Sequence, residues 1–371
     1  MTEATHLKIP LSAWLFPVLA VAFYPVATAL GFGATFEATP IGLALAIVMV
    51  PILFGAVFAA VHHAEVIAHR VGEPYGTLVL TVSVTVIEVA LIASVMIADA
   101  AGSPTLARDT VLAVVMIVVN GLSGLCILVG GFHYREQSFR VTGASAYVAV
   151  LAVLSTLTLI LPNFTRAVPG PEFSASQLGF VGVMTLILYA AFLYIQTVRH
   201  RDYFIVLTKR DSDAEDHLPS NRDVAASAAL LLTALVGVVL LSKKFAVVVE
   251  HARLALGAPA AVTGLIVAVL ILLPEGMAAV QAARKDELQK SINLALGSSL
   301  ATIGMTFPAV ALVALVLGKT VTLGIDATDE VLLALTLLVS GLTFGTGRSN
   351  ILYGFIHLII FATYLFLTFA P

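Results

Sequence analysis

Eleven stretches of about 20 mainly apolar residues alternate along the chain with short polar breaks. Each is long enough to cross a bilayer as a helix, because a hydrocarbon core of about 30 Å takes about 20 helical residues. Helices are expected because a spanning segment must satisfy its own backbone N–H and C=O groups. The pattern therefore predicts an all-α polytopic membrane protein. The 11 predicted spans cover residues 12–32, 41–61, 76–98, 110–132, 144–162, 177–197, 225–245, 259–283, 292–317, 329–345 and 350–369.

The composition excludes several classes of protein. Of the 371 residues, 60% are hydrophobic and only 11% are charged, whereas soluble domains carry about 25% charged residues. A soluble enzyme is therefore excluded, and the net charge of −3 excludes a nucleic-acid partner. The single cysteine, Cys126, cannot form an intramolecular disulfide. Gly318-Lys319-Thr320 resembles the end of a phosphate-binding loop, but Val313 stands where the first glycine belongs, so we expect neither ATP nor a resident cofactor.

Lysine and arginine residues indicate the orientation. With the N-terminus in the cytoplasm, thirteen of them fall in cytoplasmic breaks and six in external ones. Cytoplasmic loops carry an excess of these residues. We therefore expect a multi-pass protein of the cytoplasmic (inner) membrane, with its N-terminus cytoplasmic and its C-terminus external.

The chain also contains a repeat. AEVIAHRVGEP, which begins at Ala64, aligns with VEHARLALGAP, which begins at Val249. The aligned pairs are Glu65 with Glu250, Gly72 with Gly257 and Pro74 with Pro259. Five spans separate the copies, so the second copy has inverted topology, as in secondary transporters. The predicted organisation is an extra N-terminal transmembrane helix (1–40), a first five-helix repeat (41–198), an acidic cytoplasmic linker (199–224) and a second five-helix repeat (225–371).

Two glutamates are deeply embedded in the predicted spans, one in each repeat. Glu88 lies in TVSVTVIEV and Glu275 in LILLPEGMA. A carboxylate at this depth costs about 3 kcal/mol. One interpretation is a protonated structural glutamate in each helix. The corresponding positions of the two glutamates in the repeats favour a second interpretation. In it, both glutamates bind a cation and protons, which compete for the same carboxylate oxygens.

Neighbouring polar groups are candidates for supporting ligands. Thr81, Thr85 and Glu88 share one helix face at i, i+4 and i+7. Pro274 cannot donate to the carbonyl of Leu270, which frees that oxygen. Calcium takes six to eight oxygens, so two glutamates need such helpers. Further candidates, for which helix packing is an equal alternative, are Asn120, Ser298, Ser299 and Thr302.

Two further acids, Glu65 and Glu250, fall where predicted spans meet loops. They could pass ions toward the embedded glutamates, or they could form interfacial ion pairs with residues such as Arg253. The acidic run Asp211–Asp216 begins like an EF-hand loop, but Asp216 and Arg222 occupy the positions that need glycine and glutamate. We interpret this run as a solvated linker, with calcium collection as the alternative.

Three runs resemble the bacterial calcium/proton antiporters of the cation/calcium exchanger superfamily, including its sodium-potassium/proton branch. They are His62–Val89 (HHAEVIAHRVGEPYGTLVLTVSVTVIEV), Ala107–Gly121 (ARDTVLAVVMIVVNG) and Leu272–Gly304 (LLPEGMAAVQAARKDELQKSINLALGSSLATIG). The resemblance implies eleven helices, inverted repeats, and one acid from each repeat that binds the cation alternately with protons; these acids match Glu88 and Glu275. The superfamily's Gly-Asn-Ala-x-Glu pattern is altered here, with Thr85 and Leu272 in place of asparagine.

The sequence therefore predicts a secondary antiporter, not an enzyme, whose partners are a metal cation, protons and the lipid bilayer. We expect Ca²⁺ export in exchange for H⁺ by alternating access. The altered asparagines leave Na⁺(K⁺)/H⁺ exchange as the alternative. An intramembrane hydrolase is a further alternative, but aspartyl proteases of that kind need two membrane aspartates, and the aspartates here lie in loops or at span ends.

Overall fold

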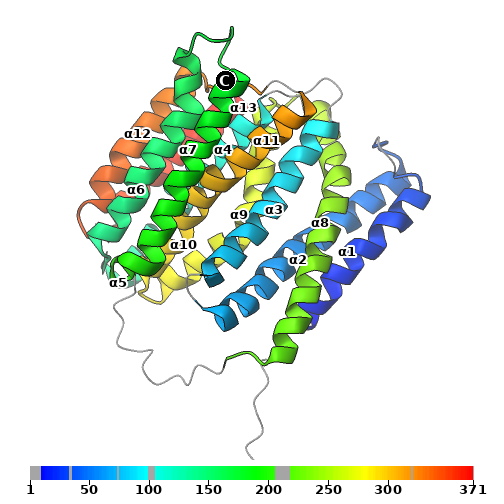
Figure 1. The fold of residues 1–371 in the computed structure, drawn as a ribbon, viewed down its shortest axis with the longest axis horizontal. Coiled ribbons are helices and arrows are strands. Elements are labelled where there is room, and N and C mark those ends of the chain that lie inside the picture. The colour runs from blue at the N-terminus through cyan, green and yellow to red at the C-terminus, as the bar shows by residue number, and fades with distance from the viewer. Residues whose placement is uncertain are drawn as a thin grey trace, which may run out of the picture. The chain divides into compact units, whose positions relative to one another are not determined.

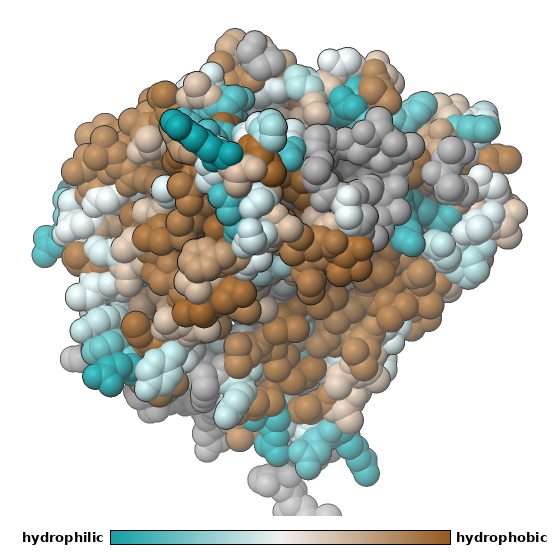
Figure 2. All heavy atoms as spheres, turned by 45° about the horizontal axis from the view of Figure 1, so that its top comes forward, coloured by the Kyte–Doolittle hydropathy of each residue, from teal (hydrophilic) through white to brown (hydrophobic). Residues whose placement is uncertain are grey.

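The structure is a computed structural model, and its fold is almost entirely helical. Among the residues that it describes, eleven helices are long and apolar enough to cross a membrane, which confirms the predicted fold class. Figure 1 follows them from blue α1 to red α13, and Figure 2 shows broad areas of hydrophobic side chains between smaller hydrophilic groups. The described residues are 10–32, 36–72, 75–98, 105–204, 218–318 and 321–370.

The chain divides into two compact units. The first comprises Met1–Gly102 with Arg210–Gly257, and the second comprises Ser103–Lys209 with Ala258–Pro371. Within the first unit, α8 packs against the three other helices, and α2 also packs against α1 and α3. The helices of this unit are α1 (Leu11–Ala29), α2 (Pro40–Val71), α3 (Tyr75–Ala98) and α8 (Asn221–Ala255).

Buried polar side chains join helices of the first unit. His63 on α2 is fully buried, with Nε2 3.0 Å from the carbonyl oxygen of Ala13 and Nδ1 3.2 Å from Oγ of Ser227. A carbonyl only accepts, so Nε2 carries the proton and Nδ1 accepts from the serine hydroxyl. Lys244 on α8 donates to the carbonyl oxygen of Phe32. The N-terminal helix α1 is thus tied to both α2 and α8 through His63.

The second unit contains the remaining helices and two short strands. Its hydrophobic core is built mainly from α4, η1, α5, α6, α9, α10 and α12. Among the described residues, four spans contain a π-helical segment: Leu106–Tyr134, Val141–Phe164, Ala175–Arg199 and Leu288–Val316. The elements are α4 (Leu106–Val115), η1 (Met116–Leu122), α5 (Ser123–Tyr134), β1 (Glu136–Ser138), α6 (Val141–Ser155), η2 (Thr156–Ile160), η3 (Leu161–Phe164), α7 (Ala175–Tyr194), η4 (Ile195–Arg199), η5 (Arg201–Tyr203), α9 (Ala261–Arg284), α10 (Leu288–Ala301), η6 (Thr302–Thr306), α11 (Phe307–Leu317), α12 (Ala327–Phe344), β2 (Arg348–Asn350) and α13 (Ile351–Phe369).

Contacts between loops of the second unit agree with the number of spans. β1 pairs antiparallel with β2, with Gln137 opposite Ser349. Six spans lie between these strands in the chain, and four lie between Glu172 and Thr322, which form an isolated bridge. An even number of crossings returns the chain to the same side of a membrane. In each of the two pairs, the topology therefore places both loops on the same side of the membrane.

The inverted repeat has structural counterparts. The first helices of the repeats, α2 and α8, are each followed by a glycine with positive φ, 73° at Gly72 and 63° at Gly257. L residues with side chains rarely adopt this conformation, so these glycines allow the chain to leave each helix. The third span of each repeat contains a π-helical segment, η1 or η6. The aligned glycines thus share a conformation, and the π-helical segment is a shared feature that the sequence alignment did not include.

The first helices of the two repeats are longer than the sequence predicted. The predicted spans 41–61 and 225–245 are parts of helices that continue to Val71 and Ala255. Glu65 and Glu250 therefore lie within α2 and α8, and the prediction that they fall where spans meet loops was wrong. The added turns contain histidine, glutamate and arginine, which lower the hydropathy while still permitting a helix.

Candidate cation-binding site

Glu88 lies in the middle of α3. It is the fourteenth of 24 helical residues, so about 20 Å of helix precedes it at 1.5 Å per residue. Its side chain is 1% exposed. Thr85 lies almost one turn earlier on the same helix and is also buried, whereas Thr81, two turns before Glu88, is half-buried. One face of α3 therefore presents two hydroxyls and a carboxylate, as the sequence predicted.

Glu275 occupies the corresponding place in the second repeat. It is the fifteenth of 24 residues in α9 and is half-buried. Pro274 lies inside the helix, and both it and Leu270 are buried. A proline has no N–H with which to bond the carbonyl four residues earlier. The backbone oxygen of Leu270 is consequently left without its usual helical donor.

The helix that packs against α9 contributes buried hydroxyls. Ser299 on α10 is 0% exposed, and its Oγ has no hydrogen-bond partner in the described part of the chain. A buried hydroxyl without a partner costs about 1–3 kcal/mol. A cation bound by the Ser299 hydroxyl would offset this cost. Thr302 is buried where the π-helical segment η6 begins, and Ser298 is half-buried. π-Helical turns are frequent at functional sites.

Asn120 lies on the other π-helical segment, η1, and is part of a buried polar network. Its Nδ2 donates to Oγ1 of Thr336 at 2.8 Å, and its Oδ1 is 3.0 Å from Nδ1 of His357. The other ring nitrogen of His357 is 3.1 Å from Oγ1 of Thr343. The sequence analysis singled out Asn120 but missed the three other members of the network on α12 and α13, of which Thr336 and His357 contact Asn120 directly. A histidine within a predicted span was the available signal, because ionisable residues in membranes are rare.

The two acids that were expected at the rim differ in their surroundings. Glu65 on α2 is exposed. Glu250 on α8 forms an ion pair with Arg253, in which the arginine Nε is 2.9 Å from Oε2. This contact matches the interfacial ion pair considered for Glu250. The acidic run 211–216 lies outside the described residues.

Comparisons with known proteins identify the family of the chain. Residues 41–198 and 226–370 match the family described as Sodium/calcium exchanger protein. The chain is 45% identical over 363 residues to y4hA of Sinorhizobium fredii, named as a candidate ionic transporter, and the match covers 98% of this chain and 97% of that protein. It is 35% identical over 371 residues to the sodium-potassium/proton antiporter ChaA of Escherichia coli, covering 99% of each chain.

The fold also occurs in a solved structure. YfkE, described as a Ca²⁺/H⁺ antiporter, matches with a TM-score of 0.72 and 16% identity, covering 97% of this chain and 100% of that one. The family match spans most of the chain and includes both helices that carry the embedded glutamates. The chain therefore belongs to the sodium/calcium exchanger family, and it is a multi-pass membrane cation antiporter rather than an enzyme.

Proposed function

We propose that the protein exports Ca²⁺ in exchange for protons, with Glu88 and Glu275 as the groups that bind both. The observation that carries this proposal is their matching position: each lies near the middle of the second helix of its repeat. Carboxylates at such depth cost about 3 kcal/mol. A structural role gives no reason for both repeats to bear this cost at the same place, whereas a shared transport site does.

The proposed exchange follows from competition for the same oxygens. A carboxylate binds a cation when it is deprotonated and carries a proton otherwise. In alternating access, the cation-loaded and the protonated forms are both neutralised, whereas an empty pair of carboxylates would carry two negative charges through the membrane. Because that state is costly, it does not cross, and transport of the cation is coupled to return of protons.

The charge and oxygen supply favour a divalent ion. Two carboxylates balance the charge of one Ca²⁺, which takes six to eight oxygens in flexible geometry. We assign the supporting oxygens to the hydroxyls of the α3 face and of α10, and to the freed carbonyl of Leu270. The buried and unpartnered Oγ of Ser299 supports this assignment most directly.

Exchange of Na⁺ or K⁺ for protons is the second candidate. It is favoured by the 35% identity over 371 residues to a protein named as a sodium-potassium/proton antiporter. The altered Gly-Asn-Ala-x-Glu pattern, with Thr85 and Leu272 in place of asparagine, favours the same candidate. The two candidates differ in which cation dissipates a proton gradient.

The distribution of basic residues gives the proposed orientation. Thirteen of the lysine and arginine residues fall on the side of the N-terminus and six on the other. We therefore place the N-terminus in the cytoplasm and the protein in the inner membrane of a bacterium. In this orientation, protons that enter the cell drive the cation outward.

Inside-out vesicles that contain the purified protein test the proposal. After a proton gradient is imposed, Ca²⁺, Na⁺ or K⁺ is added separately, and dissipation of the gradient is followed with a pH-sensitive dye. We expect Ca²⁺ to dissipate the gradient in wild-type vesicles, and Glu88→Gln and Glu275→Gln to abolish the signal. Glu136→Gln is the matched control, because Glu136 is exposed in β1 outside the spans. Wild-type exchange in either variant of the embedded glutamates would refute the mechanism.

A further inference from the structure

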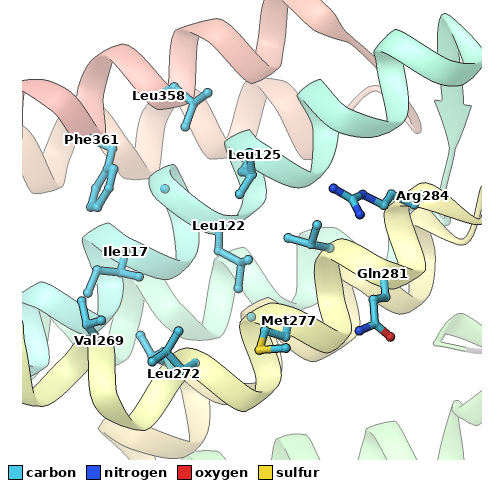
Figure 3. Close-up of a pocket in the computed structure, with 14 residues that line it drawn as sticks. Ile117, Leu122, Leu125, Val269, Leu272, Met277, Gln281, Arg284, Leu358 and Phe361 are labelled. Carbon is cyan, nitrogen blue, oxygen red and sulfur yellow. The ribbon is translucent and has the colours of Figure 1, made fainter.

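An apolar groove runs along α9 in the second unit. Its volume is about 550 Å³, within the range of small-molecule sites. α9 forms one wall, and η1, α5 and α13 form the others (Figure 3). Val269 and Arg284 both line it, and these residues are about 22 Å apart along the helix at 1.5 Å per residue. The groove is therefore long and narrow.

The walls are made of side chains that suit a hydrocarbon ligand. Ile117, Leu122, Leu272 and Phe361 are among the lining residues, and Met277 is 51% exposed. All of the walls belong to helices that are long and apolar enough to span a membrane. The surrounding solvent at this depth is lipid. An unfilled groove would lose dispersion contacts along both of its walls, so an acyl chain is the natural occupant.

One end of the groove is cationic. Arg284 is the last residue of α9, and its guanidinium points toward Leu125 (Figure 3). Within the described part of the chain, no acidic side chain forms an ion pair with it. The acids that follow have other partners, since Asp286 accepts from Gln137 at 2.9 Å and Glu287 lies 3.6 Å from Lys290. The guanidinium is thus available to an anion at the membrane surface.

We propose that the groove binds an anionic phospholipid, with one acyl chain between α9 and α13 and the phosphate on Arg284. The dimensions fit a lipid of a single leaflet. One leaflet with its headgroup region is about 20–22 Å thick, half of the whole bilayer, and the groove extends about 22 Å from its cationic end. Gln281 lines the same end and offers a further donor. Arginine forms bidentate bonds with phosphate, which adds geometric specificity.

The lipid would lie beside the helix that carries Glu275. Leu272 and Gly276 line the groove and flank that glutamate in sequence. A Cβ atom at Gly276 would lie 3.7 Å from Leu122 Cδ1, an ordinary contact distance. A leucine side chain at this position would therefore occupy the groove without an enforced backbone clash. The site is proposed independently of which cation is transported.

Photo-cross-linking in nanodiscs tests the proposal. Phosphatidylglycerol and phosphatidylcholine, each with a diazirine in one acyl chain, are incorporated separately, and the labelled peptides are identified by mass spectrometry. We expect phosphatidylglycerol to label residues of α9, α5 and α13 that line the groove. Gly276→Leu should prevent this labelling. Arg284→Gln should lower it about fivefold and remove the preference for the anionic lipid.

Two matched variants serve as controls. Gly179→Leu makes the same change on α7, where no atom lies within 4 Å of the added Cβ. Lys285→Gln removes the exposed charge next to Arg284 outside the groove. Equal labelling in Gly276→Leu and Gly179→Leu would overturn the groove as the binding site. Labelling insensitive to Arg284→Gln would overturn the phosphate contact, and a groove that neither lipid labels would overturn a lipid as its occupant.

Discussion

Nδ1 of His357 lies 3.0 Å from Oδ1 of Asn120, and both side chains are 0% exposed. An amide oxygen only accepts, so Nδ1 carries the proton and Nε2 accepts from the hydroxyl of Thr343. Asn120 in turn donates to Thr336. The network joins η1 to α12 and α13, and it fixes both the tautomer of the histidine and the orientation of the amide.

Replacement of His357 is expected to destabilise the protein. His357→Ala leaves the amide oxygen of Asn120 and the hydroxyl of Thr343 without their partner, and each buried unsatisfied group costs about 1–3 kcal/mol. The midpoint of thermal unfolding in detergent measures the effect. His133→Ala is the matched control, because His133 is exposed and bonds only Val129 on its own helix. Equal losses of stability in the two variants would contradict the assigned network.

Close packing of α4 against α9 gives a second prediction. A Cβ atom at Gly264 would lie 2.8 Å from the backbone N of Thr110, too close for a real contact. Gly264→Ala should therefore destabilise the protein by about 1–3 kcal/mol. Gly179→Ala is the matched change, since open space surrounds Gly179 on α7. It should be neutral or stabilising, because alanine favours a helix by about 1 kcal/mol over glycine.

Unfolding in detergent distinguishes the two glycine variants when both are measured under the same conditions. A lower midpoint for Gly264→Ala alone agrees with a close helix crossing. Similar midpoints would mean that α4 and α9 can separate at little cost, which would contradict the packing at this position.

Hydropathy predicted the spans because the bilayer requires about 20 apolar residues for each crossing. The embedded glutamates could be found in the same way, since Glu88 and Glu275 are conspicuous in apolar surroundings. The ends of α2 and α8 could not be predicted from hydropathy, because polar residues with good helix propensity extend these helices beyond their apolar stretches. Glu65 and Glu250 were consequently placed where spans meet loops.

The pairing of His357 with Asn120 and the π-helical segments were not predictable from the sequence. His357 and Asn120 are 237 positions apart, and only the packing of α13 against η1 and α5 brings them together. No residue pattern in Met116–Leu122 or Thr302–Thr306 marks a π-helical turn. These features depend on tertiary contacts, whereas the spans and embedded acids depend on local composition.

Competition between protons and the cation predicts a steep pH dependence of binding. The cation binds the deprotonated carboxylates, so its apparent affinity falls as the pH falls. If both Glu88 and Glu275 must release a proton, the apparent Kd rises by up to about 100-fold for each pH unit in the range where both are protonated. If only one does, the limit is about tenfold.

Calcium binding to the purified protein, measured by isothermal titration calorimetry at several pH values, gives this slope. Glu136→Gln should retain it, because that glutamate is exposed outside the spans. A Kd that does not change with pH would contradict a shared site for protons and cation.

Pro274 provides the last prediction, which separates a ligand role from a structural one. Pro274→Ala supplies the missing N–H to the carbonyl of Leu270, so the helix should gain stability, by up to about 3 kcal/mol. If that carbonyl is a ligand, the apparent Kd for Ca²⁺ rises about fivefold, the effect of losing about 1 kcal/mol. Pro51→Ala, a matched change inside α2, should leave the Kd unchanged. A more stable Pro274→Ala protein with wild-type affinity would show that the proline shapes α9 without supplying a ligand.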